Sequence, residues 1–431
     1  MTLLIDKKNA CTALAKDGRL IEVFIDAAGG NSKNDNAGGS WVGRVIVGRL
    51  KTILPGQFAF VDIGAKKNAF MNLRKGHGLR AGTPVLVQVE KDAIGTKGMC
   101  VTTDICLKGR LVVLRAPVAK HVESVTDSRN CEAISVHSKN GPPPGVGVSR
   151  KIDCPKEAAR LKKILRKALP HGFSAVVRTN AAGQSEEALT AELVSLHATL
   201  EKIADRAQFA LPPTVLWPIA SGAGSEVSAA GGDGATGTHS AVVPEYILSD
   251  ILSDDIEEIH VQTDSDEEFL AIKHTICQVF PVSEGRIFRE MISLKKQIRA
   301  ALTKEVRLPC GGFITIEQTE ACVVIDVNTG SNVGDGGYRQ TVLVTNIEAA
   351  AVIAAQLRLR NLSGIVIVDF ISMQSGADKQ ELLTVLAAET AKDRIKVEIL
   401  GFTALGMVEM TRARVRPPLA EMVAQQENRV K

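Results

Sequence analysis

The sequence is poor in aromatic residues and in net charge, and it lacks long apolar segments. Only 4% of its 431 residues are aromatic, and 52 basic side chains face 48 acidic ones. Any surface for a polyanion must therefore come from local groups of Lys and Arg. No segment approaches the roughly 18 apolar residues that a membrane span requires, and the N-terminus lacks a secretory signal pattern. We expect a cytoplasmic protein without a membrane span.

Paired-cysteine motifs are also missing. The eight cysteines are scattered without a C-x-x-C pair, so the sequence gives no support for a zinc ribbon or a redox motif. A chain of this length is too long for one ordinary core, and we expect two to four structural units.

The chain changes character several times along its length. Residues 1–25 predict two short strands around a turn at "KDGR", and short β-like pieces from residue 41 predict a small barrel. Residues 104–217 mix strands with helices, including one from about 186 with Ser185 as its N-cap. The glycine-rich segments at 26–40 and 219–242 are typical of loops.

Two acids follow Val/Ile-rich segments. "TEACVVIDVN" places Asp326 near the end of a predicted strand, and "GIVIVDFI" does the same with Asp369. Between them, "TNIEAAAVIAAQLRLR" predicts a helix with Thr345 as N-cap and Glu348 completing a capping box. A strand, a helix and a second strand in about 50 residues predict neighbouring parallel strands, with both acids at their carboxyl ends.

Strand periodicity places Asn328 on the same face as Asp326. Two adjacent carboxylates repel each other unless a cation lies between them, and Mg²⁺ is well suited because it binds one or two carboxylates together with water and phosphate oxygens. Such an ion would activate water and neutralise charge on a phosphodiester. Single acids at strand ends are usually caps or ion-pair partners, so the matched pair with its asparagine carries this interpretation.

Three longer motifs resemble the ribonuclease E/G family of bacterial endoribonucleases. They are "EVRLPCGGFITIEQTEACVVIDVNTG", "TNIEAAAVIAAQLRLRNLSGIVIVDFISM" and "LGMVEMTRAR". The resemblance implies Mg²⁺-dependent cleavage of single-stranded RNA that leaves a 5′-phosphate and a 3′-hydroxyl, in rRNA maturation or mRNA turnover. Asp326 and Asp369 would hold the metal, and Asn328 would orient the attacked phosphate or water.

The resemblance also implies a multidomain α/β architecture. An RNase H-like subdomain would comprise residues 1–38 and 218–301, with a flexible insertion at 219–242. It would be interrupted by an OB-fold RNA-binding domain at 39–103 and a 5′-end sensor region at 104–217. A DNase I-like catalytic subdomain at 302–416 and a C-terminal tail at 417–431 would follow.

Further site residues are carried over from the family at matching positions. Phe60 and Phe70 would stack on RNA bases, and Lys97 would contact RNA; without the family, both Phe would be read as barrel core. The residues implied for a pocket that binds a 5′-monophosphate are Gly109, Val113, Arg178, Thr179 and Lys396. A guanidinium and a hydroxyl suit phosphate oxygens, although an Arg–Thr pair at a strand end is usually a solvated edge.

The sequence departs from the family at its end. No cysteine follows Cys322, so the C-P-x-C zinc link and the small dimerisation domain of larger members have no counterpart. A homo-oligomer is compatible with the sequence, but the family's zinc-linked dimer is not supported.

Two other functions are compatible with parts of the sequence. The chain could be a non-catalytic RNA-binding protein on the same scaffold, although all three catalytic positions are intact. It could instead be a phosphatase with Asp326 as nucleophile, but the acid/base position two residues on is Asn328. No G-x-x-x-x-G-K-[ST] loop indicates an NTPase.

Overall fold

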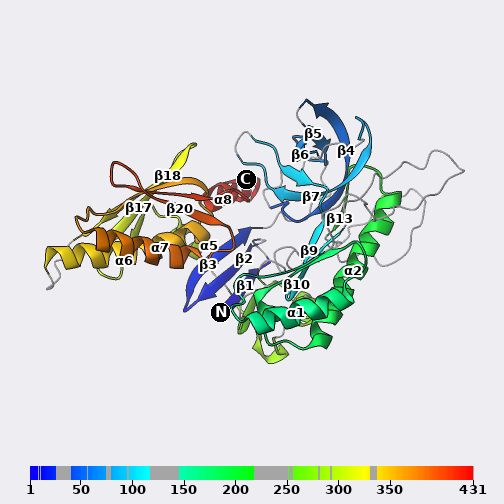
Figure 1. Cartoon of the computed structure of the whole chain (residues 1–431), viewed down its shortest axis with the longest axis horizontal. Helices are drawn as coiled ribbons and strands as arrows, with labels where there is room; N and C mark the ends of the chain where they lie inside the picture. The colour runs from blue at the N-terminus through cyan, green and yellow to red at the C-terminus, as the bar shows by residue number, and fades with distance from the viewer. Residues whose placement is uncertain are drawn as a thin grey trace, which may run out of the picture. The chain divides into compact units, whose positions relative to one another are not determined.

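The computed structural model describes residues 1–7, 9, 11–25, 40–55, 57–73, 79–94, 97–116, 145–217, 251, 256–279, 282–291, 294–330 and 337–430. The predicted loop at 219–242 lies outside this set, as does the predicted loop at 26–40 apart from Ser40. Two compact units are present (Figure 1). The first comprises Met1–Ile25, Glu258–Gln262 and Phe288–Lys431, and the second Asp26–Glu257 and Thr263–Ile287.

The N-terminal residues form part of a five-stranded sheet in the first unit. Its order is β15 (Ile287–Arg289), β14 (Glu258–Gln262), β1 (Thr2–Asp6), β2 (Cys11–Lys16) and β3 (Arg19–Ile25). The chain before residue 26 thus contains three strands where the sequence predicted two. The predicted turn is confirmed, since Asp17 and Gly18 both have positive φ, as an Asp-Gly hairpin turn requires.

The predicted barrel is confirmed in the second unit. Its five strands are β4 (Val45–Leu54), β5 (Phe58–Asp62), β6 (Ala69–Asn72), β8 (Cys100–Thr102) and β7 (Pro84–Lys91), and β4 closes the barrel by pairing with β7. A sixth strand, β13 (Thr214–Trp217), joins the outside of β4. Alternate side chains such as Ala59, Val61 and Met71 fill the interior. A small barrel of five strands with this packing is OB-like.

The second unit also contains a small mixed sheet. Its order is β11 (Val146–Val148), β12 (Ser174–Val177), β10 (Val112–Arg115) and β9 (Cys106–Lys108). The α-helices within the described part of this unit are α1 (Pro155–Ala168), α2 (Glu186–Phe209) and α4 (Asp266–Val279). Ser185 caps α2 as predicted, because its side chain accepts a hydrogen bond from Ala188 N.

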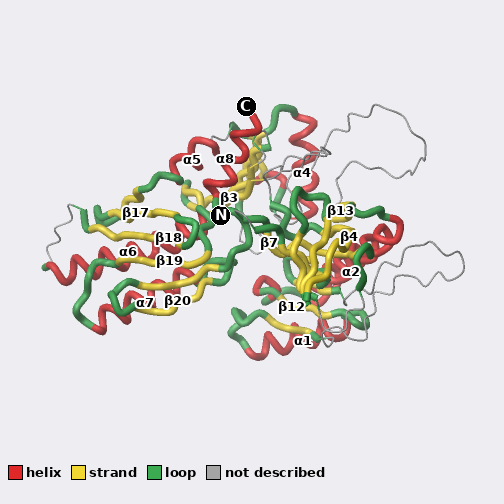
Figure 2. The backbone as a smooth tube through the Cα atoms, turned by 90° about the horizontal axis from the view of Figure 1, so that it is seen from above, coloured by secondary structure: helices red, strands yellow, loops and turns green. Residues whose placement is uncertain are grey.

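The Val/Ile-rich segments form a second sheet of the first unit. Its order is β16 (Glu305–Arg307), β17 (Phe313–Gln318), β18 (Cys322–Asn328), β19 (Gly364–Asp369), β21 (Val408–Arg412) and β20 (Val397–Phe402). β18 and β19 are parallel, as predicted. One face packs on α6 (Tyr338–Leu359) and α7 (Gly376–Thr390), and Figure 2 shows both helices along this sheet. The opposite face is open, with Val324 38% and Ile365 51% exposed.

The predicted start of α6 is wrong. The helix begins at Tyr338, so the proposed cap Thr345 lies two turns inside it and donates its hydroxyl to Thr341 O at 2.8 Å. Glu348 makes no capping box, because its Oε2 accepts from Cys310 N at 2.7 Å. A tertiary contact therefore uses the residue that the local pattern had assigned to a cap.

A small core lies between the N-terminal sheet of the first unit and three helices. Side chains from β2 and β3 pack with α5 (Leu294–Ala301), the end of α6 and α8 (Leu419–Val430). Its buried members include Val23, Leu294, Leu359 and Leu419. Residues 417–431, predicted as a tail, thus include a helix that packs on this core.

The helix α6 is the one described helix long and apolar enough to cross a membrane. Its buried residues, among them Val342, Ala349, Ile353 and Leu357, belong to the core beneath the β16–β21 sheet. That packing is typical of a core helix in a water-soluble fold.

Candidate active site

Asp326 and Asp369 lie side by side at the carboxyl ends of β18 and β19. They are direct register partners in the parallel pair, so their Cα atoms are separated by about one inter-strand spacing, roughly 4.8 Å. Both side chains are exposed, while the flanking Ile325, Val327 and Val368 are buried against the helices. The two acids therefore share the open face of the sheet.

Asn328 lies beside Asp326, as its strand position predicted. Its side-chain Nδ2 donates to Asp326 Oδ2 at 2.8 Å. This bond fixes one carboxylate oxygen and leaves the other directed away from the amide. It also orients the side-chain carbonyl oxygen of Asn328, which is a neutral oxygen beside the Asp326 carboxylate.

The oxygens at this position fit a small divalent cation. Among the described residues, no group of three or more His, Cys, Asp or Glu side chains forms a metal site. A pair of carboxylates is nevertheless what Mg²⁺ commonly uses, because water and substrate phosphate oxygens complete its coordination. Adjacent exposed carboxylates with a neighbouring amide oxygen therefore suit Mg²⁺ better than zinc, which prefers nitrogen and sulfur.

A glycine turn supports the end of β18. A Cβ atom on Gly312 would lie 2.7 Å from Asn328 O, and one on Gly330, where φ is +60°, would lie 2.7 Å from Gly311 O. Both contacts are too close for any side chain. The "CGG" and "NTG" segments of the sequence thus fit together because glycine lets their backbones approach.

Asn346 is a supporting residue that the sequence did not single out. It is fully buried on α6, donates Nδ2–H to Ile371 O at 2.8 Å and accepts from Ile371 N at 3.0 Å. Ile371 is two residues beyond Asp369, so this pair of bonds holds the chain that leaves the acid. The sequence could not show it, because the partner is a backbone group 25 positions away.

We predict that Asn346→Leu lowers kcat for the reaction carried out at the acid pair about 10- to 100-fold. The change leaves the N–H and C=O of Ile371 unpaired, at roughly 1–3 kcal/mol each, and releases the segment after Asp369. Thr345→Val is a matched control, since Thr345 is equally buried but its hydroxyl bonds Thr341 O within α6 and the Cys310 thiol, and not the chain that follows Asp369. Equal kcat values for the two variants, both folded by circular dichroism, would contradict this positioning role.

The predicted RNA-stacking residues lie on the outside of the barrel. Phe60 and Phe70 are register partners with ring centroids 6.2 Å apart, and neither belongs to the barrel core. Phe58, which the sequence analysis overlooked, is 38% exposed and 5.3 Å from the Phe70 ring. The interpretation of these Phe side chains as core filler is therefore wrong.

Lys97 lies close to this aromatic cluster. It is exposed, and the chain just after it runs beside β6, with Phe70 N donating to Met99 O at 2.7 Å.

The sequence contained a signal for Phe58. Side chains alternate along a strand, so Phe58 and Phe60 of β5 point to the same face.

Four of the predicted sensor residues gather in the β9–β12 sheet. Arg178 Nη1 donates to Gly109 O at 2.6 Å, and its backbone N–H donates to Leu111 O at 2.8 Å. The Thr179 hydroxyl lies 3.1 Å from the Ser149 hydroxyl, and Val113 pairs with Val176 of β12. The structure thus brings Gly109, Val113, Arg178 and Thr179 together.

Glu192 supports this group from α2 and was not anticipated. Its Oε1 accepts from Leu111 N at 2.7 Å and Val112 N at 2.8 Å, and it occupies the space where a Gly109 Cβ would lie. Burial raises the pKa of Glu192, although these N–H donors and the nearby Arg178 charge act in the opposite direction. Gly109 is required because a larger residue would displace this carboxylate.

Lys396 lies in a different compact unit from the other four predicted sensor residues, so its part in this pocket stays a prediction. It belongs to the first compact unit, where its ammonium pairs with Glu398 at 3.2 Å and its side chain is 79% exposed.

Comparisons with known proteins agree with the motifs. A family model described as "Ribonuclease E/G family" matches residues 138–227 and 236–415. Ribonuclease G of Haemophilus influenzae is 32% identical over 95% of this chain and 78% of its own length. Ribonuclease G of Escherichia coli K12 is 30% identical over 89% and 74%, and ribonuclease E of Nostoc is 32% identical over 86% and 51%.

A parallel strand pair that ends in two acids, in a chain with an OB-like barrel, is compatible with the fold class implied by the motifs. The matched segments extend through most of the chain, including both acids. The chain belongs to the ribonuclease E/G family.

Proposed function

We propose that this protein is a Mg²⁺-dependent endoribonuclease that cuts single-stranded RNA, leaving 5′-phosphate and 3′-hydroxyl ends. The observation that carries the proposal is the register pairing of Asp326 with Asp369, with Asn328 bonded to the first. We further propose that it acts in the cytoplasm, in rRNA maturation or mRNA turnover, and that its subdomains follow the division implied by the family.

The proposed chemistry assigns one task to each side chain. Asp326 and Asp369 hold the ion through their exposed carboxylates, and Asn328 keeps the Asp326 carboxylate in one orientation. A bound Mg²⁺ would activate water and neutralise charge that develops on the phosphodiester. The open face of the sheet leaves room for an extended RNA backbone.

The barrel would hold unpaired bases on its outer aromatic cluster. Stacking on Phe58, Phe60 and Phe70 is tolerant of sequence and contributes roughly 1–3 kcal/mol per base. Paired bases are already stacked within a duplex, so this surface favours single strands.

Cleavage of matched RNAs tests the proposal. Wild type should cut an A/U-rich single strand in Mg²⁺, leave the same strand intact within a perfect duplex, and yield downstream fragments that a 5′-phosphate-dependent exonuclease degrades. Tight RNA binding without cleavage would favour the alternative, a non-catalytic RNA-binding protein.

We predict that Arg178→Gln removes discrimination between RNA 5′ ends. A guanidinium bonded to a phosphate contributes about 1.5–3 kcal/mol, so wild type should cut 5′-monophosphorylated RNA about 10- to 100-fold faster than 5′-hydroxyl RNA. The variant should cut both RNAs at the 5′-hydroxyl rate. The measurement is the ratio of the two initial rates.

Lys163→Gln is the control for the 5′-end ratio, because Lys163 is an exposed cation on α1 of the same unit. It should leave the ratio unchanged. A wild-type ratio near one would remove the sensor from the proposal without affecting the proposed cleavage site.

A further inference from the structure

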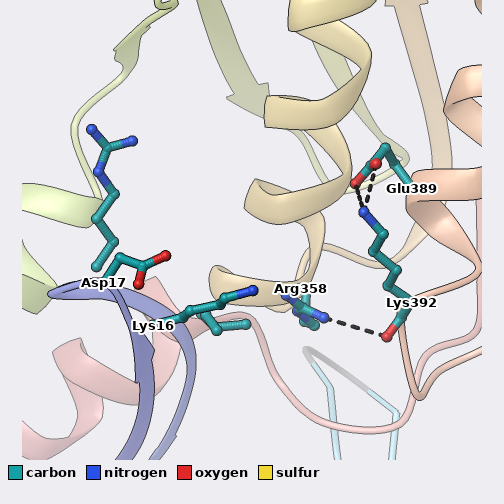
Figure 3. Close-up of a pocket in the computed structure, with 7 residues that line it drawn as sticks. Lys16, Asp17, Arg358, Glu389 and Lys392 are labelled. Atoms are coloured by element: carbon teal, nitrogen blue, oxygen red, sulfur yellow. Dashed lines mark hydrogen bonds and ion pairs between the residues drawn. The ribbon is translucent and has the colours of Figure 1, made fainter. Parts of the chain in front are cut away.

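A polar cavity lies in the first unit, away from the acids. It has a volume of about 550 Å³ and is bordered by the β2–β3 turn and the ends of α6 and α7 (Figure 3). Its lining residues are Lys16, Asp17, Arg19, Ile21, Arg358, Glu389 and Lys392. Arg358 lies in the last turn of α6, before β19 begins, whereas Asp369 ends that strand. The cavity and the acids are thus separated by about the length of a six-residue strand, roughly 20 Å.

The walls of this cavity are fixed by buried contacts. Next to its lining residue Ile21, Glu22 forms an ion pair with Arg394 at 2.9 Å, and both side chains are largely buried. Phe24 lies 4.8 Å from the Arg416 guanidinium, and Leu359 belongs to the core shared with β2 and β3. The hairpin is therefore held in place against the end of α6.

Part of the positive charge here has an internal explanation. The C-terminal ends of α6 and α7 favour cations, and Arg358 Nη1 donates to Lys392 O at 3.3 Å. The Lys392 ammonium contacts both oxygens of Glu389 at 2.6 Å. Lys392 and Glu389 therefore neutralise each other. Among the other lining residues, Asp17 is the one acid and Lys16, Arg19 and Arg358 are the cations.

The three remaining cations lack carboxylate partners within the described part of the chain. Figure 3 shows the Lys16 side chain pointing toward the Arg358 guanidinium, although like charges repel. Arg358 Nε is buried without a hydrogen-bond acceptor, again among the described residues. An anion between Lys16 and Arg358 would relieve the repulsion and accept this N–H bond.

We propose that this cavity binds a phosphate group of the RNA backbone. Lys16, Arg19 and Arg358 would contact the phosphate oxygens, and none of the described residues that line the cavity is an aromatic residue that could stack on a base. Recognition is therefore independent of sequence. This proposal rests on the proposed function, because that function supplies the RNA. It adds a contact with the RNA backbone at the end of the sheet opposite the acids.

RNA binding without cleavage tests this site. Fluorescence anisotropy of a 5′-hydroxyl single-stranded RNA is measured in EDTA over a series of KCl concentrations. Lys16→Glu/Arg19→Glu should raise Kd about fivefold or more and reduce the salt slope of log Kd by about 1.4, since each contact with a single strand contributes about 0.7. Arg358→Gln should also raise Kd.

A matched control makes the same charge change elsewhere in the unit. Lys295→Glu/Lys296→Glu alters two exposed lysines of α5 and should change Kd and slope much less. Equal effects of the two double variants would overturn the proposal, as would no effect of either. Because the experiment measures binding and not cleavage, its result distinguishes a failure of this proposal from a failure of the proposed nuclease activity.

Inorganic phosphate separates the two sources of a phosphate group. At constant ionic strength, phosphate should weaken RNA binding by the wild type more than by Lys16→Glu/Arg19→Glu. Calorimetric binding of inorganic phosphate to the wild type, with unchanged RNA affinity in the variant, would assign the cavity to a small phosphate compound and overturn the RNA proposal.

Discussion

Asp369→Asn is expected to lower kcat for RNA cleavage at least about 1,000-fold. A divalent ion supplies several kcal/mol of charge stabilisation, and each 1.36 kcal/mol corresponds to a factor of ten. The amide keeps the shape of the side chain but removes its charge beside Asp326, its register partner. RNA affinity should change by less than about threefold, because base stacking and phosphate contacts supply it.

Glu409→Gln is the control for this loss. Glu409 belongs to β21 and pairs in register with Ile367, two residues before Asp369 on the same strand. Loss of one carboxylate there should leave kcat within about threefold of wild type. Cleavage by Asp369→Asn at a rate similar to Glu409→Gln would show that the acid pair is not the catalytic centre.

Arg412→Met is expected to destabilise the first unit by about 3–5 kcal/mol, because it leaves Asp393 as a buried, unpaired charge. Arg412 Nε donates to Asp393 Oδ2 at 2.8 Å, and the two side chains are 1% and 5% exposed. Arg412 also donates to Asn361 Oδ1 and Leu362 O, which connect α6 to β19. Urea unfolding followed by circular dichroism measures the change.

Arg299→Met removes an arginine from an exposed ion pair and is the control for Arg412→Met. Arg299 pairs with Glu427, and their side chains are 62% and 40% exposed. Such pairs contribute about 0–1 kcal/mol, so this variant should unfold near the wild-type urea concentration. A similar small shift for Arg412→Met would contradict the buried role of Arg412.

The strand pair with its acids could be predicted because its evidence is local. The β18 and β19 segments are Val/Ile-rich, and β19 ends at its acid, whereas β18 ends two residues after its acid. The exposure of Val324 and Ile365 could not be predicted, since continuous apolar strands suggest burial on both faces. Only the structure shows that helices cover one face.

Features that depend on distant partners could not be predicted. The capping-box pattern at Thr345 and Glu348 misplaced the start of α6 because Glu348 instead bonds Cys310, 38 positions away. Asn346 and Glu192 also depend on distant partners, because each bonds a backbone group, 25 and 81 positions away respectively. Local sequence patterns carry no information about such contacts.

The central claim is that Asp326 and Asp369 hold a metal ion that RNA cleavage requires. Its most direct test is cleavage of one A/U-rich single-stranded RNA by wild type and Asp369→Asn, first in EDTA and then after excess Mg²⁺ is restored. The account predicts cleavage only by wild type and only with Mg²⁺. Cleavage by wild type in EDTA, or equal cleavage by the variant in Mg²⁺, would contradict it.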